Sequence, residues 1–284
     1  MLFDTHAHVN FKAFSEDADE VIKRALSEGV WMNNVGTQID TSREAVEMAE
    51  KYPEGVYATI GLHPVHTYSQ HVDEEESSFQ TREEKFDYEA YKQLALNPKV
   101  VGIGECGLDY YRIKNNELGI RNTEQIKNLQ KDAFVQQIKL AKEANKALAI
   151  HCRPSVGSQD AYIDILKILD EQGVKNLRFE IHSFTGEVQT VQEFLNRGAY
   201  VGLNGIITFD KTGNMQRVVE AVPLDRIVLE TDAPYLTPVP NRGKRNEPAF
   251  VKFVAERISE IKKVSVDEVS SQTTTNAKKL FNLV

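Results

Sequence analysis

The sequence lacks long hydrophobic runs: no stretch of about 18 consecutive apolar residues occurs, so we expect no membrane-spanning segment. Its first residues have neither the basic nor the apolar region of a secretory signal. Only two cysteines are present, Cys106 and Cys152, and no CxxC spacing occurs, which argues against a zinc finger and a disulfide framework. We therefore expect a cytoplasmic protein with two buried, reduced thiols.

Positive charge is also scarce. The chain has 34 Lys and Arg against 42 Asp and Glu, a formal net charge of −8. Broad, non-specific binding of nucleic acid needs surplus cations, so this balance argues against it but permits a nucleic acid held at one small site. The P-loop pattern GxxxxGK[ST] does not occur, so this common phosphate-binding loop is missing.

Short apolar runs with strand character recur along the chain, at residues 1–6, 30–36, 56–62, 100–105, 147–151, 177–182, 199–204 and 227–231. Helical periodicity is found at residues 17–28, 41–51, 86–96, 123–145, 159–172, 187–197, 214–221, 249–263 and 265–281. Strands that alternate with helices predict a parallel sheet, and eight such units fit a closed (β/α)₈ TIM barrel. No composition shift marks a boundary, so we expect one domain over residues 1–284.

Histidines and carboxylates recur where the predicted strands end. His6 and His8 close the first run, and residues i and i+2 of a strand project from the same face. Other runs end in Glu105, His151, His182 and Asp232. The carboxyl ends of barrel strands form the active-site mouth, so these six side chains should converge. They supply enough ligands for two divalent ions if Glu105 bridges them.

Ligand chemistry limits which ions these are. Imidazole favours Zn, Mn, Fe or Ni, whereas Mg suits an oxygen-rich position. Asp232 has two candidate roles, as a terminal ligand or as the base that deprotonates the attacking water. Adjacent strand residues face opposite sides, so Cys106 and Cys152 should point away from the metals.

Six motifs carry a resemblance to a known family: Asp4-Thr5-His6-Ala7-His8, Gly61-Leu62-His63-Pro64, Gly104-Glu105-Cys106-Gly107-Leu108-Asp109-Tyr110, Ile150-His151-Cys152-Arg153, His182-Ser183-Phe184-Thr185-Gly186 and Glu230-Thr231-Asp232-Ala233-Pro234-Tyr235. They resemble the signature motifs of the TatD family of metal-dependent deoxyribonucleases, from residue 2 to about residue 280. The resemblance implies an amidohydrolase-like TIM barrel with DNase activity, often 3′–5′ exonuclease on single strands. It also implies that the six residues named above bind the metals.

The chain departs from the family pattern at three places. Ser183 stands where the family often has Cys, residues 65–85 form a longer and more acidic stretch, and residues 112–122 look extended. We interpret residues 65–85 as a solvated loop or insertion that is too polar for a core. Both long loops should lie at the mouth, where they would narrow or acidify access.

Further residues are candidates for substrate contact. His63 is interpreted as forming a hydrogen bond to a substrate phosphate or to the metal-bound water, or else as a turn residue. Asn204 would orient substrate or satisfy a loop carbonyl, and Arg153 would contact phosphate. Loop 241–248 carries Arg242, Lys244 and Arg245, which would bind phosphate or form a solvated charge run. Tyr110, Phe184 and Tyr235 would stack a terminal base or pack the mouth.

The sequence thus predicts a divalent-metal-dependent hydrolase that cleaves phosphodiester bonds, with Asp232, Glu105 and His63 as catalytic residues. Its expected substrate is a DNA end or a small phosphate ester, with no obligate protein partner. The main alternative uses the same metals on an ester or amide, such as aminoacyl-tRNA. A non-catalytic binding protein would be expected to have a broken ligand set, yet all six ligands are present.

Overall fold

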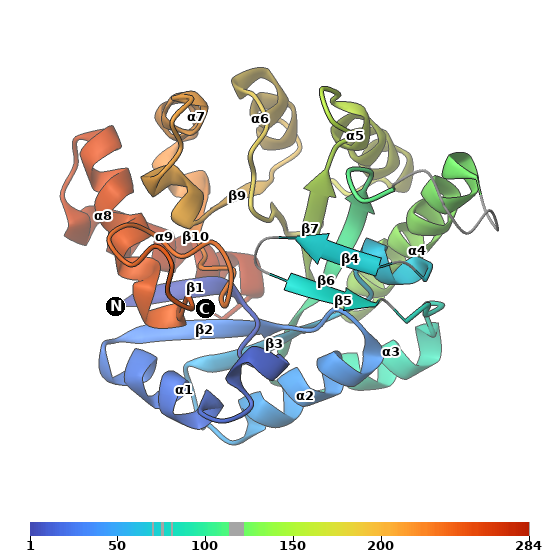
Figure 1. Cartoon of the computed structure of the whole chain (residues 1–284), viewed down its shortest axis with the longest axis horizontal. Coiled ribbons are helices and arrows are strands. Elements are labelled where there is room, and N and C mark those ends of the chain that lie inside the picture. Colours follow the sequence, from blue (N-terminus) through green and yellow to red (C-terminus); the bar gives the residue numbers. More distant parts are fainter. Residues whose placement is uncertain (70, 75–76, 81, 114–121, 284) are drawn as a thin grey trace.

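The computed structural model describes residues 1–69, 71–74, 77–80, 82–113 and 122–283. Eight parallel strands close a barrel in the order β1-β10-β9-β8-β7-β6-β3-β2 (Figure 1). They are β1 (Leu2–Ala7), β2 (Val30–Val35), β3 (Val56–Ile60), β6 (Val100–Asp109), β7 (Ala147–Arg153), β8 (Phe179–Ile181), β9 (Tyr200–Leu203) and β10 (Ile227–Leu229). Every predicted run overlaps one of these strands, although β1, β6 and β7 extend beyond their runs, and the predicted TIM barrel is confirmed.

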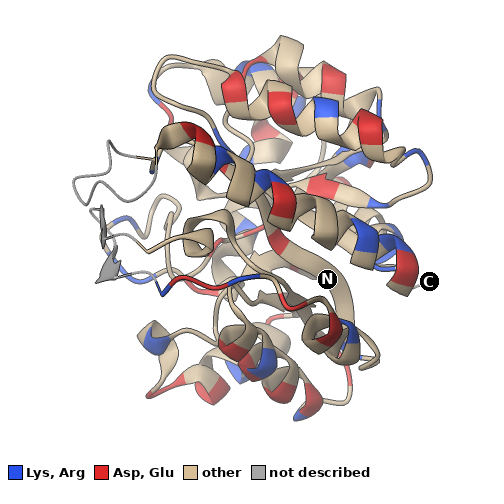
Figure 2. Cartoon of the chain, turned by 90° about the vertical axis from the view of Figure 1, so that its right-hand side faces the viewer, with Lys and Arg blue, Asp and Glu red and all other residues tan. Residues whose placement is uncertain are grey.

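Helices surround the barrel, and each predicted helical stretch overlaps one, although α2 begins before its predicted stretch (Figure 1). They are α1 (Ala18–Ser27), α2 (Ile39–Glu50), α3 (Tyr88–Ala95), α4 (Thr123–Ala144), α5 (Asp160–Gln172), α6 (Val188–Leu195), α7 (Asn214–Ala221), α8 (Val251–Lys262) and α9 (Val266–Phe281). In α4, Asn122 and Gln125 form a reciprocal capping box, and Asn145 ends the helix in the left-handed conformation. Figure 2 shows acidic and basic residues interspersed along the helices on the side that faces the viewer.

The amino-terminal end of the barrel is filled by apolar side chains. Phe3, Tyr200 and Val228 form a buried cluster there with Leu280 and Phe281 of α9. The rings of Phe3 and Phe281 lie 5.6 Å apart. Because this end is plugged, the carboxyl ends of the strands are left to form the mouth.

The acidic stretch differs from the loop that its polarity predicted. It begins with a 3₁₀ helix, η2 (Pro64–Thr67), whose four residues are buried. An antiparallel hairpin of β4 (His71–Glu74) and β5 (Ser77–Gln80) follows. Pairing between strands satisfies backbone groups whatever the side chains are, which is why a polar composition did not reveal it. Of the second extended loop, residues 114–121 lie outside the described residues.

The two cysteines and the length of the apolar helices can be compared with the expectations from composition. Cys106 and Cys152 are buried free thiols, and Sγ of Cys106 contacts the carbonyl oxygen of Ala149 at 3.6 Å. No helix in the described part of the chain has both the length and the apolar character needed to cross a membrane.

Candidate metal centre

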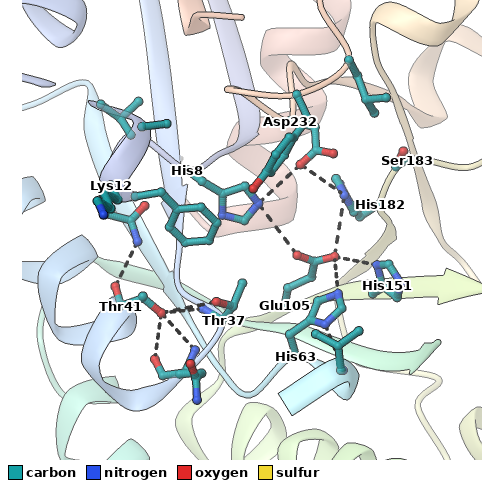
Figure 3. A pocket seen from close by; sticks show the side chains of 18 of the residues that line it. His8, Lys12, Thr37, Thr41, His63, Glu105, His151, His182, Ser183 and Asp232 are labelled. Atoms are coloured by element: carbon teal, nitrogen blue, oxygen red, sulfur yellow. Dashed lines mark hydrogen bonds and ion pairs between the residues drawn. The ribbon is translucent and has the colours of Figure 1, made fainter. Parts of the chain in front are cut away.

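Imidazoles from several strand ends meet around the carboxylate of Glu105 in β6 (Figure 3). Its Oε1 atom lies 2.7 Å from Nδ1 of His151 and 3.4 Å from Nε2 of His63. Its Oε2 atom lies 3.4 Å from Nε2 of His6 and 3.9 Å from Nε2 of His8. Glu105 therefore has one oxygen for each of two groups of histidines, as a bridging carboxylate requires.

Asp232 completes the cluster from the chain that follows β10. Its Oδ1 atom lies 3.3 Å from Nε2 of His8 and 3.8 Å from Nε2 of His182. Nε2 of His182 is also 3.8 Å from Oε1 of Glu105. The structure thus brings together all six residues that the strand-end pattern selected, and it places His63 beside them.

Backbone hydrogen bonds between β1 and the segment after β10 set the position of Asp232. The amide of Asp232 donates to the carbonyl of His6, and the amide of His8 donates to the carbonyl of Ala233, both at 2.8 Å. Asp232 has a φ of 56°, a left-handed conformation that costs about 1 to 3 kcal/mol unless its surroundings hold it. These bonds hold it, so the carboxylate turns back toward the histidines.

His182 is oriented by a buried carboxylate that the sequence analysis missed. Its Nδ1 lies 3.0 Å from Oε2 of Glu230. Oε1 of Glu230 accepts from the amide of Ser183 at 2.7 Å and from the side chain of Asn204 at 3.2 Å. A Cβ at Gly202 would lie 2.3 Å from Glu230, so only glycine leaves room for this carboxylate. Asn204, expected to orient substrate or to satisfy a loop carbonyl, is buried and donates to Glu230.

His151 is oriented by Asp109, which contacts Nε2 of the ring, whereas Glu230 contacts Nδ1 of His182. The sequence analysis also missed Asp109. Nε2 of His151 lies 3.1 Å from Oδ2 of Asp109, which leaves Nδ1 to face Glu105. The same Asp109 oxygen accepts from the guanidinium of Arg112 at 2.7 Å. Glu230 could have been found from the sequence, because it lies two residues before Asp232, the spacing that places side chains on one face of a strand. Asp109 could also have been found, because it belongs to the same motif as Glu105.

Burial and neighbouring charges set the protonation states of the cluster. Burial alone would raise the pKa of Glu105, but His63 and His182 keep it well below its ordinary value. Burial alone would also raise the pKa of Asp232, but His182, His8 and His6 together lower it below its ordinary value. Burial lowers the pKa of His6 to about 3 and that of His63 to about 4. Both carboxylates are therefore ionised near neutral pH, which is the form that binds cations.

The residues fit a divalent metal by an independent criterion. Both ring nitrogens of His6 are buried and lack a hydrogen-bond partner among the described residues. A buried polar atom without a partner is costly, and a metal ion would satisfy it. Three groups, the first two of which share His6, have ligand atoms close enough to hold an ion: His6, His8 and Asp232; His6, His182 and Glu230; and His63, Glu105 and His151. Neither cysteine belongs to these groups.

A cavity of about 2050 Å³ contains the cluster and extends beyond it. Two of the expected phosphate contacts line it, each stacked on an aromatic ring. The guanidinium of Arg153 lies 3.8 Å from the ring centre of Tyr111, and that of Arg242 lies 4.0 Å from the ring centre of Phe209. Glu44 and Glu47 of α2 also line the cavity.

Other expected substrate contacts lie elsewhere. Arg245 pairs with Asp17 at 2.6 Å and does not line this cavity, and neither does Lys244. Of the three aromatic candidates, only Tyr235 lines the cavity. Tyr110 and Phe184 are buried, and the Tyr110 hydroxyl donates to Asp164. Phe209 and Tyr111 were not selected, because no sequence pattern predicts that a ring will lie under a distant arginine.

A TIM barrel with histidines and carboxylates converging at the carboxyl ends of its strands has the architecture of a metal-dependent hydrolase. Comparison with known proteins agrees. The family model described as TatD related DNase matches residues 3–282, and the chain belongs to this family. It is 40% identical to the Bacillus subtilis (strain 168) uncharacterized metal-dependent hydrolase YabD over 284 residues, covering 100% of both chains.

Two further relatives extend the comparison. The 3′-5′ ssDNA/RNA exonuclease TatD of Erwinia tasmaniensis is 32% identical over 289 residues, which cover 99% of this chain and 100% of that protein. The crystal structure of YjjV, a TatD homologue from Escherichia coli K12, superposes with a TM-score of 0.81 at 25% identity, covering 99% of this chain and 98% of that one. The chain is thus a metal-dependent hydrolase of the TatD family.

Proposed function

We propose that this hydrolase cleaves phosphodiester bonds at the 3′ end of single-stranded DNA and releases mononucleotides. The observation that carries the proposal is the pairing of Arg153 and Arg242 with aromatic rings in the cavity that holds the metal-type cluster. Arginine binds phosphate bidentately, and a ring beneath it fixes its plane. Small-molecule pockets occupy about 300 to 1000 Å³, so a cavity of about 2050 Å³ has room for more than one nucleotide.

His6, His8, Glu105, His151, His182 and Asp232 would hold two divalent ions, which supply water activation and charge neutralisation when bound. Asp232 accepts a proton from the attacking water, because it is ionised and faces the cluster. The water oxygen bonds to phosphorus, the bond to the leaving nucleotide oxygen breaks, and that oxygen takes up a proton. Arg153 and Arg242 bind the flanking phosphates.

The net charge of −8 fits this mode of binding. Both signs are interspersed on the helices that Figure 2 shows, so this side offers a long duplex no continuous basic surface. A strand end needs only the few cations that line the cavity. The Erwinia relative named as an exonuclease on ssDNA and RNA supports the same substrate class.

The test is cleavage of a labelled single-stranded oligonucleotide after chelation and add-back of Mg²⁺, Mn²⁺, Zn²⁺ or Co²⁺. We expect stepwise release of mononucleotides that requires the added ion. Asp232→Asn should lower the rate by a factor of about 10² to 10⁴, the usual contribution of a positioned base, with the circular dichroism spectrum unchanged. Deacylation of charged tRNA by the same samples, without cleavage of DNA, would instead establish the ester-hydrolase alternative.

A further inference from the structure

The ring of His63 is fixed by a contact that determines which of its nitrogens carries a proton. His63 follows β3 and is the N-terminal cap of η2, where its Nδ1 accepts a hydrogen bond from the amide of Val65 at 3.1 Å. A backbone amide can only donate, so Nδ1 must present a lone pair. The single proton of the neutral ring is then on Nε2.

His8 shows the opposite arrangement in the same cluster. Its Nδ1 lies 2.8 Å from the carbonyl oxygen of Val35. A carbonyl can only accept, so this Nδ1 carries the proton and Nε2 presents a lone pair toward Asp232. His8 thus has the form that a metal ligand needs, whereas His63 presents an N–H group.

The Nε2–H group of His63 points into the reaction cavity. Its nearest described acceptor is Oε1 of Glu105 at 3.4 Å, beyond the usual range of about 2.7 to 3.2 Å for an N–H···O bond. His151 contacts the same oxygen at 2.7 Å. His63 therefore keeps a buried donor that faces the cluster and lacks a short acceptor.

We propose that His63 is a fixed hydrogen-bond donor to a non-bridging oxygen of the scissile phosphoryl group, and not a metal ligand. The proposal rests on the proposed phosphodiesterase function. A ring that already holds a proton on Nε2 cannot take one from water there, so it is unsuited to be the base. Asp232 lies on the other side of the Glu105 carboxylate, where it can take that role (Figure 3). Charge that develops on the phosphoryl oxygen would strengthen the hydrogen bond from His63.

Substitutions can separate this donor from the capping function of the same side chain. In His63→Asn the amide oxygen still caps η2, since Asn is a favoured cap, but the donor at the position of Nε2 is lost. We expect kcat on single-stranded DNA to fall by a factor of about 10² to 10³, the usual cost of losing one such donor, with KM changed only a few-fold. In His63→Gln an amide N–H reaches nearer to the original position and should restore part of kcat.

Metal content distinguishes a donor from a ligand. After equilibration with Mn²⁺ or Zn²⁺ and gel filtration, His63→Asn should retain the wild-type amount of metal. His182→Asn, a matched change in one of the predicted ligands, should retain less. Loss of metal from His63→Asn equal to that from His182→Asn would overturn the proposal, and so would a wild-type kcat in His63→Asn.

The ring proton can also be observed directly. In Zn²⁺-loaded protein with ¹⁵N-labelled histidine, a long-range ¹H–¹⁵N spectrum should show His63 with a protonated Nε2 and an unprotonated Nδ1. The signal is assigned by its loss in His63→Asn. A protonated Nδ1 would overturn the proposal. Inactivity of the wild type on DNA would overturn the proposed function, and this spectrum would still decide whether His63 is a donor or a ligand.

Discussion

Two buried glutamates near His182 differ in their hydrogen bonds, although both lie inside the barrel. Glu230 contacts Nδ1 of His182 and accepts from Ser183 and Asn204. Glu180 has no hydrogen-bond partner for either carboxylate oxygen among the described residues. Burial and the nearby Glu230 raise the pKa of Glu180 well above its ordinary value, which favours its neutral form. Glu230, in contrast, has the contacts of a carboxylate that orients a metal-binding ring.

We expect Glu230→Gln to weaken metal binding about 10-fold to 100-fold, the usual effect of removing the carboxylate behind a metal-binding histidine. The amide is neutral and cannot stabilise the proton on Nδ1 of His182. The control is Glu180→Gln, which replaces a neutral acid by an amide of nearly the same shape and should leave affinity within a few-fold. Isothermal titration of chelated protein with Mn²⁺ measures both. Equal affinities in the two variants would contradict the assigned role.

Local rules made the ligand set predictable from the sequence. The alternation of side chains along a strand and the polarity of a parallel barrel selected His6, Glu105 and Asp232 without tertiary information. The same rules did not predict the contacts of Asn204 and Arg245, because these contacts involve residues far along the chain. Asn204 is fixed by Glu230, and Arg245 by Asp17.

At the scale of elements, α4 holds two strand ends in place through glutamines two helical turns apart. The side chain of Gln137 accepts from the amide of Leu62 and donates to its carbonyl, both at 2.9 Å. Gln130 does the same for Asp109, at 2.9 and 3.0 Å. Residues seven apart lie on one helix face, so both reach the barrel. The position of His63, which follows Leu62, thus depends on a helix some 75 residues later.

Gln137→Leu should lower the free energy of unfolding by about 2 to 4 kcal/mol, because it leaves the amide and carbonyl of Leu62 buried without partners. Urea denaturation monitored by circular dichroism measures the change. Gln136→Leu is the matched control on the adjacent, partly exposed position, where we expect a change within about 0.5 kcal/mol. A similar small change in both variants would show that these two hydrogen bonds do not matter for stability.

The outline of the barrel was predictable because each βα unit repeats the same change of period, from strand to helix. The acidic hairpin was not, since β4 and β5 pair with each other and not with a strand of the barrel. Likewise, the buried position of residues 64–67 follows from their packing at the mouth rather than from hydrophobicity. Elements outside the repeating unit therefore needed the structure.

At the scale of the whole molecule, five of the described histidines fall into two groups with opposite effects on stability. His6, His63 and His66 have lowered pKa values, chiefly because of burial. Burial would also lower the pKa values of His151 and His182, but Asp109 and Glu105 raise the first and Glu230 and Glu105 raise the second. An unfolded histidine titrates near pH 6.5. The histidines with lowered pKa values therefore change stability below that pH, and those with raised pKa values change it above that pH.

We expect the free energy of unfolding of the chelated protein to pass through a maximum near pH 6.5. Below this pH the unfolded chain binds protons that folded His6, His63 and His66 do not, so stability falls as pH drops toward about 4. Above it, folded His151 and His182 keep protons that the unfolded chain releases, so stability falls as pH rises. Urea denaturation between about pH 5 and pH 8 measures the profile. His6→Asn should flatten the acidic side and leave the alkaline side unchanged, whereas an unchanged acidic side would refute the assignment.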